Sequence, residues 1–415
     1  MFFIYSMVYT AAALILFFPQ YLKRPQALRR KWLRNKLGIF DLDPGIKTPV
    51  WVHAVSVGEV TAAIPFLNRL KADHPAQPVI VSTITDTGQN VAMAKMPAGT
   101  TVVYMPFDIG FILRRCLGRV SPRLFIVVET EIWPGIFRAA SKCGATVIML
   151  NGRLSEKSCR GYRLLPHFMK RVLGYVSVFG MQDKASAGRM ERIGADNARI
   201  FVTGNFKFDT PGQREIPLWA KALGSPLVIA GSTHAGEEEL IISAFRENLE
   251  RFPDLRLILA PRHPERFSEV EDLLRKSGLP FIKRTDIDEL RLSEYKVKRI
   301  VLLDSIGELS AVYGAGDIAV IGKSFLGYGG QNPLEPALLG KAVICGPHME
   351  NFSFMPEFYE NGAAFQVEQN GLAKMIRNLL TEPGKAQKAG DRARELSEKN
   401  AGAVQRSLEI IRQYL

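Results

Sequence analysis

Short apolar runs rich in β-branched residues alternate with longer stretches of helical periodicity from residue 49 onward. This alternation is typical of parallel βαβ units, whose strands are buried on both faces. The candidate strands of the first half are 50–54, 79–83, 101–105, 124–129, 146–150, 176–181 and 200–203. Those of the second half are 227–230, 255–260, 281–283, 300–304, 318–321, 342–345 and 364–367. The pattern predicts an α/β protein with two Rossmann-like, doubly wound domains.

A polar, turn-rich break at 209–213 separates the two halves. We expect an N-terminal domain over 41–209, a linker over 210–214, and a C-terminal domain over 215–415 that includes the last helices. Doubly wound sheets bind ligands outside the carboxyl ends of their strands. The two domains are therefore expected to face each other across a ligand-binding cleft.

Residues 1–22 carry no charged side chain. As a helix this segment would be about 33 Å long, enough to span a bilayer or embed in it. Seven Lys or Arg and no Asp or Glu occur in the first 40 residues, all of them after the apolar run. By the positive-inside rule they place the rest of the chain on the cytoplasmic face. We expect 1–40 to be a membrane anchor with a basic segment for anionic lipids, at a bacterial inner membrane.

Two alternatives for this segment are less consistent with the sequence. A cleaved signal peptide has basic residues before its apolar run and a small-residue cleavage site after it, whereas Pro19, Gln20 and Tyr21 close this run. A buried first helix is disfavoured because the basic stretch through Trp32 and Leu33 suits a headgroup surface better than a protein core. Whether the helix crosses the bilayer or lies in its surface stays open.

Composition narrows the class of protein further. The chain has 415 residues, 47% of them hydrophobic and 23% charged, which excludes a single small module and a disordered or coiled-coil chain. Of the net charge of +13, seven units belong to the first 40 residues, so 13 − 7 = 6 remain for the rest and no nucleic-acid partner is expected. The four cysteines show no C-x-x-C spacing, and we expect them to be reduced core residues of a cytosolic protein.

Three loops of the first half bring candidate chemistry to strand ends. Glu59 follows the first strand at the start of a helix-like run, where a carboxylate either caps the helix or acts on a ligand that approaches beside Gly58. Glu129 and Glu131 follow the strand 124–128, as an acid/base pair or with one of them in an ion pair. Lys207 follows the last strand and could stabilise charge on a leaving phosphate, or be a solvated surface lysine.

The second half offers groups that suit an anion or a sugar at four strand ends. Ser232 and Thr233 provide small side chains and free backbone amides, and Arg262, after Pro261, suits bidentate phosphate recognition. A turn at 305–309 and a glycine-rich turn before Glu335 complete this edge. In the latter, Asn332 can cap a helix that begins at Pro333.

Several reaction classes are disfavoured by missing motifs. The sequence has no G-x-x-x-x-G-K-[ST], H-E-x-x-H or G-x-S-x-G, and its histidines lack metal-ligand spacing. We therefore expect group transfer without a metal ion or other cofactor.

Taken together, seven ordered segments resemble the 3-deoxy-D-manno-octulosonic acid (Kdo) transferases of lipopolysaccharide synthesis. The segments are HAVSVGE at 53–59, ETEIWP at 129–134, NGRLS at 151–155, GNFKFD at 204–209, STHAGEE at 232–238, PRHPERF at 261–267 and GGQNPLE at 329–335. The resemblance implies an inverting GT-B glycosyltransferase that moves Kdo from CMP-Kdo to a lipid A precursor, the tetra-acyldisaccharide 4'-phosphate.

The resemblance also implies residue roles. Glu59 would be the general base, and Glu129 and Lys207 would stabilise the transition state. Contacts to CMP are implied for Pro261, Arg262, Ile306, Gly307, Glu308, Asn332, Pro333, Leu334 and Glu335. A helix N-terminus would lower the pKa of Glu59, so this base is expected to need a closed, dry site.

Two other functions remain as alternatives. One is a sugar-nucleotide epimerase or hydrolase of the same two-domain architecture, which the apolar N-terminus argues against. The other is a membrane-tethered nucleotide sensor without catalytic activity, which would bind CMP and turn nothing over.

Overall fold

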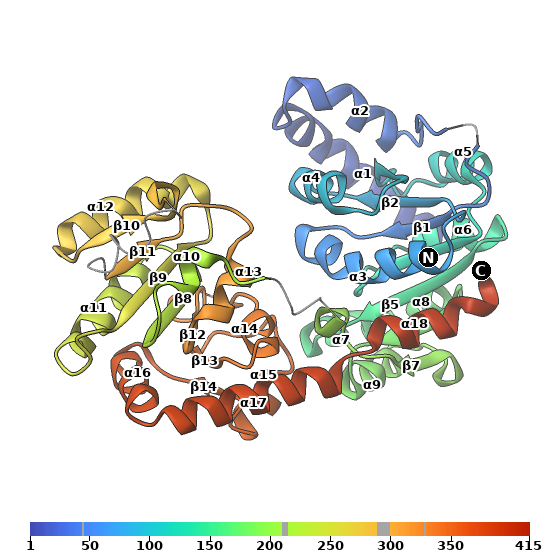
Figure 1. Ribbon diagram of the computed structural model, residues 1–415. Helices are drawn as coiled ribbons and strands as arrows, with labels where there is room; N and C mark the ends of the chain where they lie inside the picture. Colours follow the sequence, from blue (N-terminus) through green and yellow to red (C-terminus); the bar gives the residue numbers. More distant parts are fainter. Residues whose placement is uncertain (44, 210–214, 289–298, 328) are drawn as a thin grey trace. The chain divides into compact units, whose positions relative to one another are not determined.

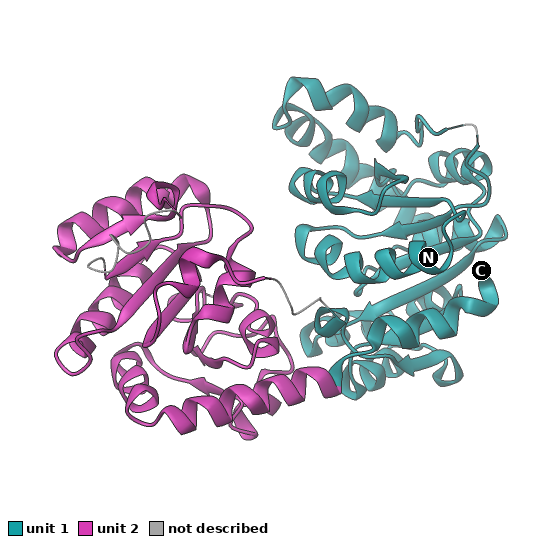
Figure 2. Cartoon of the chain, viewed as in Figure 1, with its two compact units in different colours: residues 1–210, 400–415 teal, residues 211–399 magenta. Residues whose placement is uncertain are grey.

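The chain folds into two compact units in the computed structural model (Figure 2). Unit 1 comprises Met1–Thr210 and Asn400–Leu415, and unit 2 comprises Pro211–Lys399. The structure describes residues 1–43, 45–209, 215–288, 299–327 and 329–415. The expected linker, 210–214, lies outside these residues.

Unit 1 is built on a seven-stranded parallel sheet with the order β3-β2-β1-β4-β5-β6-β7 (Figure 1). Its strands are β1 (Val50–His53), β2 (Val79–Thr83), β3 (Thr100–Tyr104), β4 (Leu124–Val128), β5 (Thr146–Gly152), β6 (Val176–Met181) and β7 (Ile200–Val202). The central strands β1, β2 and β4 are buried along their whole length, as their unbroken apolar character predicts.

Helices cover both faces of this sheet. They are α1 (Phe2–Leu22), α2 (Gln26–Lys36), α3 (Val57–Asp73), α4 (Asp86–Lys95), α5 (Gly110–Val120), α6 (Pro134–Lys142), α7 (Glu156–Tyr162), α8 (Pro166–Leu173), α9 (Lys184–Arg192) and α18 (Ala403–Ile411). Apolar side chains of α5, α6, α8 and α9 form the core on one face, and those of α3, α4 and α18 form the core on the other.

Unit 2 has a second seven-stranded parallel sheet, in the order β10-β11-β9-β8-β12-β13-β14. Its strands are β8 (Leu227–Thr233), β9 (Arg256–Pro261), β10 (Phe281–Lys283), β11 (Ile300–Leu302), β12 (Ile318–Ile321), β13 (Ala342–Cys345) and β14 (Ala364–Gln366). Its helices are α10 (Leu218–Lys221), α11 (Glu237–Leu249), α12 (Phe267–Ser277), α13 (Leu309–Val312), α14 (Leu334–Leu338), α15 (Met355–Glu360), α16 (Leu372–Thr381) and α17 (Pro383–Asn400). All the predicted strands of both halves are confirmed, with ends that differ by at most three residues.

The last helix corrects the expected domain boundary. Residues 400–415 belong to unit 1, where α18 packs beside α3, and not to the C-terminal domain as expected. The carboxylate of Asp209 accepts hydrogen bonds from the N–H groups of Gly402 and Val404, and Arg406 donates to the Thr203 carbonyl (2.8 Å). Asp209 therefore satisfies backbone donors at the start of α18.

One face of α1 docks on unit 1 while the other is exposed. The half-buried face holds Phe2, Tyr5, Ser6, Tyr9, Thr10, Ala13, Phe17 and Tyr21. The exposed face includes Phe3, Ile4, Met7, Val8, Leu14, Ile15 and Phe18. The helix is long and apolar enough to cross a membrane. It is thus neither a free-standing helix nor a core helix.

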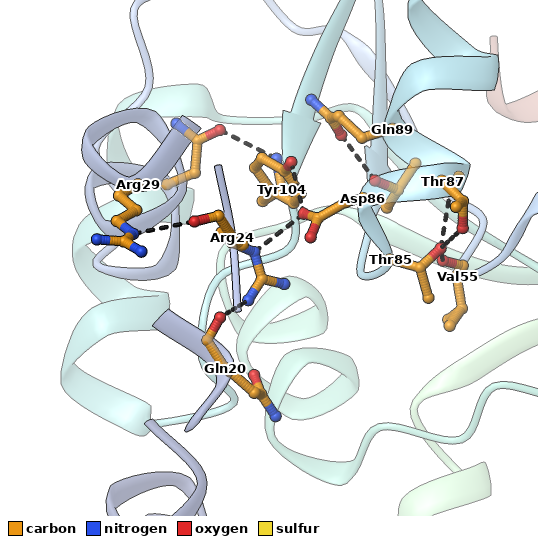
Figure 3. A network of polar contacts seen from close by, with 12 residues as sticks. Gln20, Arg24, Arg29, Val55, Thr85, Asp86, Thr87, Gln89 and Tyr104 are labelled. Atoms are coloured by element: carbon orange, nitrogen blue, oxygen red, sulfur yellow. Dashed lines mark hydrogen bonds and ion pairs between the residues drawn. The ribbon is translucent and has the colours of Figure 1, made fainter. Parts of the chain in front are cut away.

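The basic segment after α1 differs from the expectation. Trp32, Arg24 and Lys36 are buried in unit 1 and are not available to lipid headgroups. Arg24 forms an ion pair with Asp86 at the start of α4 (2.9 Å, Figure 3) and lies over the Trp32 ring. Burying these cations is tolerated because a carboxylate and aromatic rings replace water around them.

The cysteine expectation is correct for three of the four residues. Cys116, Cys159 and Cys345 are buried, whereas Cys143 is exposed after the end of α6.

Candidate functional site

The candidate residues of unit 1 lie at the carboxyl edge of its sheet. Strands β1 and β4 are neighbours there, and the chain leaves them toward opposite sides, which is the point where sheets of this type bind ligands. Glu59 follows β1 on the first turn of α3, and Glu129 is the first residue after β4. The topology therefore brings both carboxylates to one point.

Glu59 makes the contacts of a helix cap and is almost fully buried. Its Oε2 accepts a hydrogen bond from the Val55 N–H (2.7 Å), and its Oε1 accepts one from the Ser56 hydroxyl (3.0 Å). A Cβ at the preceding Gly58 would meet nothing closer than the Ser56 hydroxyl at 3.8 Å, so the backbone at position 58 is not crowded.

The pKa of Glu59 corrects our expectation. Burial raises it to about 7, and the charges of Glu131 and Glu129 act in the same direction, against the hydrogen bonds from Val55 and Ser56. The expectation of a lowered pKa at the helix N-terminus was wrong because desolvation outweighs the favourable backbone contacts. A carboxyl group with a pKa near 7 suits a general base at neutral pH.

Glu129 and Glu131 occupy the loop between β4 and α6. Glu129 has a φ of +60°, a backbone conformation that residues other than glycine rarely adopt. Glu131 accepts a hydrogen bond from the Trp133 indole N–H (2.9 Å), and burial raises its pKa. Among the described residues this hydrogen bond takes the place of the ion pair considered for Glu131. Trp133 is the N-cap residue of α6, and Pro134 is its first residue.

Lys207 is held at the same edge by the short 3-10 helix Phe206–Asp209. The buried Asn151 at the end of β5 accepts a hydrogen bond from the Phe206 N–H (3.0 Å). Burial lowers the pKa of Lys207, the Glu129 carboxylate opposes this effect, and Arg153 adds to it. Glu59, Glu129 and Lys207, the three predicted catalytic residues, are therefore electrostatically connected.

In unit 2 the first candidates lie at the end of β8. Ser232 has a φ of +56°, and the fully buried Thr233 donates its hydroxyl to Glu238 (2.8 Å). The Glu237 carboxylate accepts backbone N–H groups from His234, Lys323, Ser324 and Phe325. The His234 amide is therefore not free to bind an anion.

The two arginines after β9 have different surroundings. Arg266 pairs with the buried Glu238 (2.7 Å) and with Glu269 (2.9 Å), so it is structural. Arg262 is exposed at the strand end, where its backbone N–H donates to the Thr233 carbonyl (3.0 Å). Of the two, Arg262 is the more exposed.

The remaining candidates border the same edge. Ile306 is 81% exposed, Gly307 has a φ of +93°, and Glu308 pairs with Arg284 (3.2 Å). These residues form the turn between β11 and α13.

The glycine-rich turn ends one residue later than expected. Helix α14 begins at Leu334, with Pro333 at the capping position and not at the first helical position. Asn332 accepts a hydrogen bond from the Leu334 N–H (3.2 Å) and donates one to Glu335 (3.3 Å).

Two charged residues at these edges were not among the predicted site residues. Arg153 influences Lys207 in unit 1, and Lys323 lies two residues after the end of β12 with a φ of +56°. Both lie at predicted strand ends, so the same signal that identified Glu129 could have identified them.

Comparison with known proteins shows which family this chain is similar to. A sequence model described as 3-deoxy-D-manno-octulosonic-acid transferase (kdotransferase) matches residues 27–210. The 3-deoxy-D-manno-octulosonic acid transferase of Haemophilus influenzae is 34% identical over 380 residues, 88% of this chain and 87% of that protein. The corresponding protein of Chlamydophila psittaci is 31% identical and covers 82% of this chain and 79% of its own length.

A solved structure supports the fold alone. The putative UDP-N-acetylglucosamine 2-epimerase from Listeria monocytogenes superposes with a TM-score of 0.60 over 89% of this chain and 96% of its own, at 16% identity. The predicted GT-B type of architecture, two Rossmann-like sheets with an apolar N-terminal helix, is confirmed.

Proposed function

Because the chain belongs to the 3-deoxy-D-manno-octulosonic acid transferase family, and is therefore a glycosyltransferase, we propose that it moves Kdo from CMP-Kdo to a lipid A precursor with inversion. The observation that supports this proposal most is Glu59, a buried carboxylate on the first turn of α3 with a pKa near 7, which the charges of Glu129 and Glu131 help to raise. The acceptor is the tetra-acyldisaccharide 4'-phosphate.

In the proposed mechanism Glu59 takes the proton from the acceptor hydroxyl. The oxygen attacks the anomeric carbon of Kdo, and the bond to the CMP phosphate breaks with its electron pair leaving on the phosphate. Lys207 and Glu129 would stabilise the charges that develop, because the centre becomes oxocarbenium-like. Burial strengthens both interactions by removing competing water.

Unit 2 would hold the donor at its strand ends. Arg262 is placed to pair with the phosphate, and the residues proposed to contact CMP are Ser232, Thr233, Pro261, Ile306, Gly307, Glu308, Asn332, Pro333, Leu334 and Glu335. The hydroxyl of Thr233 is already donated to Glu238, so any contact from Thr233 would come from its backbone.

Mass spectrometry of the reaction mixture tests this function. The purified chain is incubated with CMP-Kdo made in situ and a tetra-acylated lipid A precursor, with Glu59→Gln protein as the control for a contaminating transferase. We expect product heavier by one or more Kdo units only with the wild type. Folded wild-type protein that binds CMP and forms no product would refute the proposal in favour of a sensor, and consumption of a UDP-sugar would favour the epimerase.

We also propose that the transfer needs no metal ion, since Lys207 and Arg262 supply positive charge for the phosphate. Turnover is expected to be unchanged in EDTA. Loss of activity in EDTA that is restored by a divalent cation would contradict this.

The protein is further proposed to associate with the cytoplasmic face of the inner membrane. The outward face of α1 is apolar, and Lys23, Arg30 and Lys31 beside it are exposed to anionic headgroups. Flotation with phosphatidylglycerol vesicles should be weakened by Ile15→Ser combined with Phe18→Ser. Unchanged flotation of that variant would contradict membrane binding through this face.

A further inference from the structure

Asp108 connects the apolar helix α1 to the helix that follows the Glu131 loop. This residue lies between β3 and α5 and is 2% exposed. Its Oδ2 accepts hydrogen bonds from the Tyr5 hydroxyl of α1 (2.6 Å) and from the Gly135 N–H of α6 (2.8 Å). A Cβ at position 135 would lie 2.5 Å from the Asp108 carboxylate, so only glycine allows this approach. One buried carboxylate therefore ties α1 to the first turn of α6.

A second contact joins the same face of α1 to Glu131 itself. The Tyr9 ring packs edge-on against the Trp133 ring, with centroids 6.2 Å apart. Trp133 precedes the first residue of α6, and its indole N–H donates to Glu131. Tyr9 thus contacts Trp133, the residue that orients the Glu131 carboxylate.

The corner between α1 and α2 reaches the loop of Glu59. Arg24 pairs with Asp86, and the preceding Thr85 is the N-cap of α4 (Figure 3). The Thr85 N–H donates to the Val55 carbonyl (3.3 Å), and the Val55 N–H donates to Glu59. Polar contacts joined through the backbone at residues 85–86 and at Val55 therefore connect Arg24, two residues after α1, to Glu59.

These contacts are costly to break. Asp108 is a buried carboxyl group that accepts a hydrogen bond from Tyr5, and Arg24 is a buried cation paired with Asp86. Removing one partner of either contact leaves a buried polar or charged group uncompensated. The half-buried face of α1 also holds the tyrosines of the helix, whereas its exposed face is apolar. A helix that served only as a tether would have no need of polar partners on the catalytic unit.

We propose that α1 positions the carboxylate loops of the catalytic site, with Tyr5, Tyr9 and Arg24 as positioning residues. The N-terminal helix is then a part of the catalytic unit as well as an anchor. This inference rests on the proposed function, because its effect is measured as Kdo transfer.

The test compares Tyr5→Phe with Tyr21→Phe. Both variants remove one hydroxyl from the docked face of α1, but the Tyr21 hydroxyl makes no hydrogen bond within the residues that the structure describes. Transfer is measured on acceptor dispersed in detergent, so that attachment to vesicles does not limit the rate. We expect Tyr5→Phe to lower kcat roughly three- to tenfold and Tyr21→Phe to leave it unchanged.

The pH profile separates positioning from a loss of stability. The charged groups that act on Glu59 are Glu131 and Glu129, which raise its pKa. The hydrogen bonds from Val55 and Ser56 lower it. If the Glu131 loop loosens, repulsion weakens and water enters, so the acidic limb of kcat/KM in Tyr5→Phe should move to lower pH. A purely structural role would lower the melting temperature and leave the limb in place.

The outcomes distinguish this inference from the proposed function. No product from wild-type protein would refute the function itself. If the wild type turns over normally, and Tyr5→Phe has the same kcat and the same acidic limb of its pH profile, the inference alone is overturned. Should Tyr5→Phe fail to fold, Tyr9→Leu, which removes the ring against Trp133, is expected to show the same two changes, and its failure to do so would likewise overturn it.

Discussion

The two units share a seven-stranded parallel sheet but treat the carboxylates at its carboxyl edge in opposite ways. In unit 1 no salt bridge is found for Glu59 or Glu131 within the described residues, and burial raises the pKa of both. In unit 2 Glu237 is surrounded by backbone N–H groups, and Glu238 pairs with Arg266. The first arrangement keeps carboxylates ready to take a proton, and the second uses them to shape loops.

Both edges nevertheless share one backbone feature. Glu129 and Asn151 in unit 1, and Ser232 and Lys323 in unit 2, have φ between +54° and +60°. Such conformations cost on the order of 1 kcal/mol or more each and are retained where a side chain must point in a particular direction. Thr48 and Ser121, which precede β1 and β4, also have a positive φ, so this feature alone does not mark the functional edge. What separates the two carboxyl edges is charge compensation, which suits the first to proton transfer and the second to binding.

The largest expected effect removes the base of unit 1. Glu59→Gln keeps the size of the side chain and its hydrogen bond from Val55, but cannot accept a proton. We expect kcat to fall by roughly 10²- to 10⁴-fold while the affinity for CMP, measured by calorimetry, stays unchanged. Loss of CMP affinity in this variant would show that the division of roles between the units is wrong.

The reciprocal change is made in unit 2. Arg262→Ala should raise the KM for CMP-Kdo about 10- to 100-fold, because a charged hydrogen bond contributes about 1.5–3 kcal/mol. The pH limb set by Glu59 should not move. Arg262→Lys, which keeps the charge without the bidentate geometry, is expected to fall between. Donor affinity equal to the wild type in Arg262→Ala would exclude this residue from the donor site.

A pair of glycine variants compares the packing of the two edges. A Cβ at Gly322 would lie 2.2 Å from the Ser232 carbonyl oxygen, whereas one at Gly58 meets only the Ser56 hydroxyl at 3.8 Å. Gly322→Ala should lower the free energy of unfolding by about 1–3 kcal/mol, and Gly58→Ala should not lower it. Urea unfolding measures both. Equal stability of the two variants would contradict this difference in packing around Gly322 and Gly58.

The sequence predicted the sheets and the loops of the site because both depend on local pattern. Strands buried on both faces are readable as apolar runs, and residues that follow them must lie at one edge of a parallel sheet. Glu59, Glu129 and Lys207 could therefore be grouped before their positions were known. Their grouping needs only the order of strands and loops.

The features that sequence reasoning missed depend on contacts between distant residues. The return of α18 to unit 1 requires Asp209 to meet Gly402, and the burial of Arg24 requires Asp86 on α4. The sign of the pKa shift of Glu59 depends on how deeply it is buried, which no local pattern encodes. From the sequence we expected Arg24 at a lipid surface and Asp209 in a polar break, because the partners of both residues are 62 or more positions away along the chain.

The smallest expected effect tests the electrostatics of the unit 1 edge. Because Glu59 must be ionised to act as a base, kcat/KM of the wild type should fall as the pH decreases through about 7. Glu131→Gln removes a negative charge that raises this pKa, yet its side-chain carbonyl can still accept the Trp133 hydrogen bond. The acidic limb should therefore move to lower pH, by roughly half a unit. Glu191→Gln, which removes an exposed carboxylate on α9, is the control and should leave the limb in place. A limb that stays at the wild-type pH in Glu131→Gln, or moves upward, would mean that Glu131 does not act on the base, and the contrast between the two edges would then rest on burial alone.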